Sequence, residues 1–162
     1  MKTFIAAIAV CCGLALPAAA KTYELPDANP AVSVTLPGKW KPSTVEHGVE
    51  ATSDDEETYV AVETATAKGV EALIDDDVQF LVDQGVTIKK ASQQTHDTTI
   101  NGMPCSFISW SGTDKDGPTS VTLVIFGVTD NLVLLMTAWS SPAGDKANGA
   151  ELEKIVSSIK RR

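Results

Sequence analysis

Two kinds of hydrophobic pattern divide the first half of the chain into strands and a helix. Residues 31–36 alternate between apolar and polar side chains, as in a half-buried strand, and two further β-prone runs follow at residues 48–53 and 59–66. In residues 69–86 the apolar positions recur every three or four residues, which predicts an amphipathic helix. This half is therefore predicted as three strands followed by one helix.

The second half has the pattern of an antiparallel sheet. Residues 87–96 are β-prone but polar, and their lysines favour an edge strand. Three turn signals follow, at Asn101-Gly102, Asp116-Gly117 and Asp130-Asn131. The strands at residues 121–128 and 132–139 are apolar on both faces, so both faces need cover. A second helix is predicted near the C-terminus from the spacing of Leu152, Ile155, Val156 and Ile159.

These elements predict an α+β fold of one domain. We expect a three-layer α/β/α sandwich, with a central antiparallel sheet flanked by helices and the order β-β-β-α-β-β-β-β-α. The domain is predicted to span residues 31–162. Residues 21–30, which contain Pro26 and Pro30, are predicted to form an extended leader.

The first twenty residues have the pattern of a secretory signal peptide. Lys2 is their only charged residue, an apolar run covers residues 4–16, and three alanines end at Ala20. We therefore predict a secreted, periplasmic protein that is cleaved near Ala20 and has no membrane span after processing. A lipid anchor on Cys11 or Cys12 is the alternative. It is disfavoured because these cysteines lie early in the apolar run.

Composition narrows the possible partners. The 162 residues include 13 basic and 21 acidic ones, a formal net charge of −8, which becomes −9 when residues 1–20 are removed with Lys2. Such an acidic chain is not expected to bind nucleic acid, because phosphate binding needs clustered lysine and arginine. Cys105 is the one cysteine after residue 20, so we expect no disulfide and a small buried thiol there.

Several short motifs resemble those of the PsbP/Mog-like superfamily. The run Val34-Thr35-Leu36-Pro37-Gly38-Lys39-Trp40 resembles its opening strand, Leu-Pro and Trp. Asn101-Gly102 and the closing run Ile155-Val156-Ser157-Ser158-Ile159-Lys160 are similar to its hairpin and last helix. The resemblance covers about residues 31–160. It implies an α/β/α sandwich and a binding role without catalysis, and it assigns no site residue.

The search for catalytic chemistry finds no complete motif. The chain has no G-x-S-x-G, H-E-x-x-H, P-loop, G-x-G-x-x-G or C-x-x-C pattern, and its two histidines, His47 and His96, are predicted at the surface. A hydrolase with dispersed catalytic residues remains an alternative. So does a weak divalent-cation site at the acidic runs of residues 54–57 or 75–77, whereas residues 114–117 are predicted to be a hairpin turn. No cofactor and no metal site are predicted.

Asp77 is the candidate site residue. At about 100° per residue it falls inside the apolar arc of the first predicted helix, whereas Asp75 and Asp76 fall outside that arc. A carboxylate on a buried face needs hydrogen-bond partners, or it tends to protonate. Asp77 is thus either a hydrogen-bonded core acid, an outward-turned acid on an irregular helix, or part of a ligand or partner site.

The sequence therefore predicts a secreted, non-enzymatic binding or accessory domain. Its partner is expected to be another protein or a small ligand. The divalent-cation and hydrolase interpretations are the alternatives, which converging carboxylates or a perturbed titratable cluster in a large pocket would favour.

Overall fold

The computed structural model describes residues 19–162, so most of the predicted signal peptide, with Cys11 and Cys12, lies outside the described residues. The strands are β1 (Lys21–Leu25), β2 (Val32–Leu36), β3 (Ser43–Val45), β4 (Gly48–Thr52), β5 (Thr58–Thr66), β6 (Thr87–Ile88), β7 (Gln94–Ile100), β8 (Met103–Asp114), β9 (Gly117–Gly127), β10 (Leu132–Ser140) and β11 (Lys160–Arg161). The helices are α1 (Val70–Asp83) and α2 (Pro142–Ser158), with 3₁₀ turns at Gly38–Trp40 and Lys90–Ser92.

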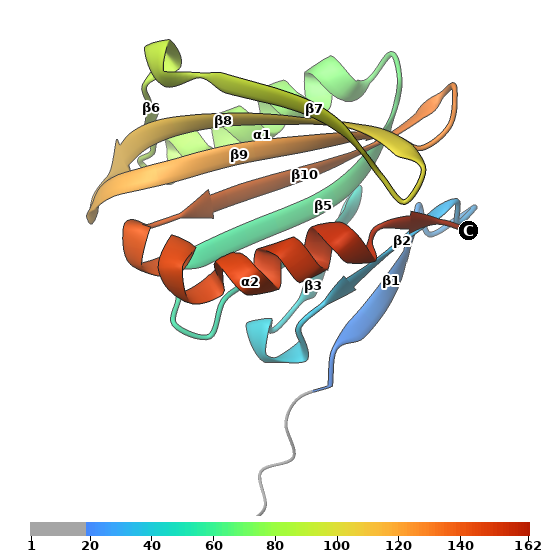
Figure 1. Cartoon of the computed structure of the whole chain (residues 1–162), viewed down its shortest axis with the longest axis horizontal. Coiled ribbons are helices and arrows are strands. Elements are labelled where there is room, and N and C mark those ends of the chain that lie inside the picture. Colours follow the sequence, from blue (N-terminus) through green and yellow to red (C-terminus); the bar gives the residue numbers. More distant parts are fainter. Residues whose placement is uncertain (1–18) are drawn as a thin grey trace, which may run out of the picture.

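A large antiparallel sheet forms the middle layer, as predicted. Its strand order is β3-β4-β5-β10-β9-β8-β6, and β7 also pairs with β8. Helix α1 lies on one face of this sheet and α2 on the other (Figure 1). The three predicted turns form the β7–β8, β8–β9 and β9–β10 connections. The three-layer sandwich is confirmed.

The N-terminal strands differ from the expectation. Residues 21–25, within the predicted leader, form β1 and pair with β2, which also pairs with β11 in a separate three-stranded sheet. The strand predicted at residues 31–36 therefore lies beside α2 rather than in the central sheet. Its apolar residues explain this position, because Val32, Val34 and Leu36 are fully buried in the main core.

The polar segment after α1 is also more complex than the predicted single strand. A short β6 and a 3₁₀ turn come first, and the long pairing with β8 begins only at β7. Strand β7 is exposed along almost its whole length, which agrees with the predicted edge position.

Apolar cores lie on both faces of the central sheet. The main core lies between the sheet, β2 and α2 and contains Trp40, Phe126 and Ile155. Smaller clusters lie under α1, around Leu73 and Leu81. Strands β9 and β10 contribute to both sides, which explains why their sequences are apolar at successive positions.

Helix α2 is fixed at both ends by polar contacts. Ser141 caps its N-terminus by accepting a hydrogen bond from the Gly144 N–H at 3.0 Å, and Pro142 begins the first turn. The Asn101 amide donates to the carbonyls of Ser157 at 2.9 Å and Ile159 at 2.7 Å, so the β7–β8 turn holds the C-terminal end. Within residues 19–162, neither helix has the length and hydropathy needed to cross a bilayer.

Candidate functional site

A cavity of about 430 Å³ opens at the end of the central sheet where the β8–β9 turn and the first turn of α2 lie, on the left in Figure 1. Three aromatic rings and five carboxylates line it, so we call it the acidic aromatic cavity. Its lining residues are Glu50, Thr52, Glu56, Glu57, Thr58, Tyr59, Phe80, Gln84, Asp114, Lys115, Asp116, Trp139 and Ser141.

The three aromatic rings come from three different elements. Tyr59 on β5 and Trp139 on β10 are directly opposite each other in the strand register, so their side chains lie on the same face. Phe80 comes from the last turns of α1, and its ring centroid is 5.3 Å from that of Tyr59 at a tilt of 36°. Tyr59 and Trp139 are half-buried, whereas Phe80 is 37% exposed. An exposed ring among polar groups is available for contact with a ligand.

The carboxylates come from two hairpins that are distant in sequence. Glu50 lies on β4, Glu56 and Glu57 on the β4–β5 turn, and Asp114 and Asp116 at the β8–β9 turn. Lys115 is the only basic lining residue, and it is paired with Asp116 in an exposed contact. The cavity therefore has an excess of negative charge, which attracts cations.

Hydrogen bonds hold two of the acids against the aromatic rings. The Tyr59 hydroxyl donates to Glu50 Oε2 at 2.8 Å, and the Trp139 indole N–H donates to Asp114 Oδ2 at 3.1 Å. Burial, and then the hydrogen bond to Glu50, raise the pKa of Tyr59, so the phenol stays protonated and remains a donor. The other Asp114 oxygen accepts from the backbone N–H groups of Asp116 and Gly117, which fixes the turn.

The acidic β4–β5 turn is also anchored, although the sequence indicates only a solvated loop. Asp55 accepts hydrogen bonds from Ser53 and from the buried Asn148 amide of α2, at 3.0 and 3.1 Å for the latter. These hydrogen bonds, chiefly that from Ser53, lower the pKa of Asp55. Ser141 donates to Glu57. The turn thus has a defined position, and Glu56 and Glu57 both line the cavity.

Asp77 lies near this cavity but does not line it. It is half-buried, accepts a hydrogen bond from the Thr137 hydroxyl, and lies beside Glu63 of β5, whereas Asp75 and Asp76 are exposed. Burial, and then the neighbouring Asp77, raise the pKa of Glu63 to about 8, and burial also raises that of Asp77. With Glu63 protonated and Asp77 ionised, the two acids can share one proton beneath α1. A role of Asp77 in ligand binding stays a prediction.

The remaining candidates lie apart from the cavity. His47 and His96 are exposed, on different parts of the chain. Cys105 is 3% exposed, and burial raises its pKa to about 11, so it is the buried, unreactive thiol that was predicted. Among residues 19–162, no three histidine, cysteine or acidic side chains are grouped so that they could hold a metal ion.

Sequence analysis did not identify Tyr59, Phe80 or Trp139 as site residues. Each had a weak signal: Tyr59 follows the acidic run, Phe80 lies at the edge of the apolar arc of α1, and Trp139 ends a strand that is apolar on both faces. The acidic turns were treated as separate loops. The structure brings residues from the β4–β5 and β8–β9 turns to one cavity.

Comparisons with known proteins show similarity in structure only. CyanoP, the cyanobacterial PsbP of Synechocystis sp. PCC 6803, matches with a TM-score of 0.61 and 10% identity over 96% of this chain and 99% of that one. LpqN of Mycobacterium tuberculosis, involved in cell envelope biogenesis, matches with a TM-score of 0.53 and 10% identity over 88% and 91%. A Bacteroides thetaiotaomicron structure matches with a TM-score of 0.59 and 15% identity over 89% of this chain and 49% of that one.

Neither protein-family models nor curated protein sequences give a match to this chain. The structural similarities nevertheless place the chain in a clear class: it has a PsbP-like α+β fold with a large antiparallel sheet and two helices. The resemblance inferred from the Leu-Pro-Gly-Lys-Trp motif and the hairpin is thus confirmed at the level of the fold.

Proposed function

We propose that this chain is an exported, non-enzymatic binding domain whose acidic aromatic cavity binds a cationic side chain of a partner protein. The observation that supports this proposal is the convergence of three aromatic rings and five carboxylates on one cavity. Aromatic faces attract ammonium and guanidinium groups, and more often guanidinium. We therefore expect the occupant to be an arginine of the partner.

Export is supported by the pattern of residues 1–20. It also agrees with the structural neighbour LpqN, which is involved in cell envelope biogenesis. A periplasmic partner that presents an arginine on its surface would meet the cavity after the signal peptide has been removed.

The position of the perturbed acids favours binding over hydrolysis. Catalytic acids need raised or lowered pKa values at a place that a substrate can reach. Glu63 and Asp77 have raised pKa values, but neither lines the acidic aromatic cavity, and Glu63 is only 9% exposed. The side chains that do line the cavity supply shape and charge for recognition.

The proposal is tested by NMR titration with two tripeptides, acetyl-Ala-Arg-Ala-amide and its citrulline analogue. Citrulline has the length and shape of arginine but no charge. The indole N–H of Trp139 lies at the cavity, while those of Trp40 and Trp110 serve as internal controls. We expect the arginine peptide to shift the Trp139 signal in a saturable manner and the citrulline peptide to leave it unmoved.

Two variants on α1 sharpen the test. Phe80→Ala should weaken binding about two- to fivefold, as expected for loss of an exposed cation–π contact. Val82→Ala, on the same helix, 50% exposed and outside the cavity, should leave binding unchanged. Equal shifts with both peptides, or shifts at Trp110 instead, would contradict the proposal. A Trp139 shift with Ca²⁺ at tens of micromolar would favour the divalent-cation alternative.

A further inference from the structure

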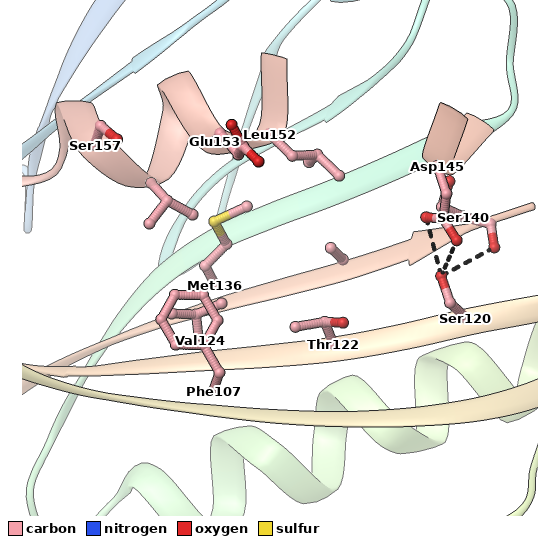
Figure 2. Close-up of a pocket in the computed structure, with 12 residues that line it drawn as sticks. Phe107, Ser120, Thr122, Val124, Met136, Ser140, Asp145, Leu152, Glu153 and Ser157 are labelled. Carbon is pink, nitrogen blue, oxygen red and sulfur yellow. Dashed lines mark hydrogen bonds between the residues drawn. The ribbon is translucent and has the colours of Figure 1, made fainter. Parts of the chain in front are cut away.

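Helix α2 leaves part of its sheet face uncovered. The helix contacts β2, β5, β9 and β10, and a groove of about 360 Å³ remains between it and the side chains of strands β8 to β10 (Figure 2). The apolar side chains of this α2 groove are Phe107, Val124, Met136, Ala138, Leu152 and Val156. Its volume lies in the range of small-molecule sites, about 300 to 1,000 Å³.

The two ends of the α2 groove differ in chemistry. At one end the Ser120 hydroxyl lies 3.1 and 2.9 Å from the two Asp145 oxygens and 3.4 Å from the Ser140 carbonyl (Figure 2). At the other end Phe107, Val124 and Met136 form an apolar floor. Ser120 and Val124 are four residues apart on β9, which separates the two ends by roughly 13 Å.

The polar end has the charge and hydrogen-bonding capacity to accept a cation. A carboxylate has about four lone-pair sites, and the Ser120 hydroxyl is the only side-chain donor to Asp145 among the described residues. Glu153 adds a second acid about two turns further along α2. Among the lining residues, all within the described chain, none is basic.

The helical phase of Gly149 places it between residues that line the groove. It follows Asp145 by four residues and precedes Leu152 and Val156 by three and seven, so it lies on the same helix face. A Cβ atom at Gly149 would meet nothing within 4 Å. A larger side chain at this position can therefore extend into the groove without displacing the backbone.

We propose that the α2 groove binds a single-chain amphipathic amine. The hydrocarbon chain lies along Ala138 toward Met136 and Val124, and the ammonium group lies at Asp145. This site is distinct from the acidic aromatic cavity, because the two share no lining residue: Ser140, at the end of β10, lines the groove, and Ser141, the N-cap of α2, lines the cavity. Apolar contact gives affinity, and the single anchored carboxylate gives preference for the charged head group.

The test compares n-octylammonium with 1-octanol, which has the same chain and an uncharged head, both below the concentration at which octylammonium forms micelles. Methyl NMR signals of Val124, Met136, Leu152 and Val156 report binding. We expect saturable one-to-one binding of the amine at these methyl groups, with 1-octanol at least about threefold weaker, as for loss of a partly exposed ion pair.

Three variants separate the parts of the proposal. Asp145→Asn should bring the amine to the affinity of 1-octanol and leave 1-octanol unchanged. Gly149→Leu should abolish binding of both, with a folded spectrum as its control. Asp75→Asn, an exposed acid on α1 across the sheet, should have no effect. Equal affinity for amine and alcohol, unchanged binding to Gly149→Leu, or shifts confined to Trp139 would overturn the proposal.

Discussion

The Glu63–Asp77 pair makes the stability of this protein depend on pH in a defined direction. The pKa of Glu63 rises from an ordinary 4.5 to about 8, first because the side chain is buried and second because Asp77 lies beside it. Between these pH values the folded state holds a proton that the unfolded chain has lost. The free energy of unfolding therefore falls as pH rises, until Glu63 is ionised in both states above about pH 8.

Glu63→Gln is the most direct perturbation of this pair. The glutamine amide can donate to the Asp77 carboxylate as protonated Glu63 does, but it cannot ionise. The free energy of unfolding changes by about 1.4 kcal/mol per pH unit between pH 5 and the Glu63 pKa of about 8, so its total change between pH 5 and pH 9 is at most about 4 kcal/mol. Asp77 beside it also has a raised pKa, so the charge that develops at high pH is divided between the two acids, and we expect about 2 kcal/mol.

Urea unfolding followed by tryptophan fluorescence at pH 5, 7 and 9 measures this difference. Glu63→Gln should match the wild type at pH 5 and exceed its stability at pH 9, and Asp77→Asn should likewise stabilise more at pH 8 than at pH 5. Glu71→Gln, an exposed acid on α1, controls for the change in net charge and should give no such pH dependence. Parallel wild-type and Glu63→Gln profiles from pH 5 to pH 9 would refute the shared-proton pair.

Two further predictions concern α2 and processing. Gly144→Ala should destabilise the protein by about 2 kcal/mol or more, because its Cβ would lie 2.4 Å from the Glu57 carbonyl oxygen. Gly149→Ala, on the same helix with open space around it, should instead stabilise by about 0.5 to 1 kcal/mol in the same urea assay. The exported protein should begin at Lys21 and carry one free thiol; an intact mass that retains residues 1–20, or a lipid adduct, would contradict this.

The sequence pattern predicted which face of an element is buried more reliably than which elements are neighbours. The three hairpin turns and the double-sided apolar strands were enough to predict the central sheet and the helices on its two faces. The same pattern could not distinguish β2 from a central strand, because alternation reports a buried face and not the sheet to which a strand belongs. Pairing of β2 with both β1 and β11 joins segments from opposite ends of the chain.

For Asp77, helical phase alone predicts burial but not the residues that it contacts. The phase correctly placed it inward and Asp75 and Asp76 outward. Helical phase could not predict its partners, because Thr137 lies on β10 and Glu63 on β5, and phase describes one helix only. Alternation along β5 does put Glu63 on the face opposite Val60 and Val62, but only the packing of α1 across that face brings the two acids together.

The acidic aromatic cavity could not be predicted from the sequence either, because its residues come from turns that only the strand order brings together. Acidic turns satisfy local turn chemistry and solubility whether or not they meet, so their composition alone does not indicate a site. What brings the β4–β5 and β8–β9 turns to one end is the strand order β4-β5-β10-β9-β8, in which β5 pairs with a strand more than sixty residues later. Because that pairing also sets Tyr59 opposite Trp139, the same contact that closes the sheet creates the aromatic wall of the cavity.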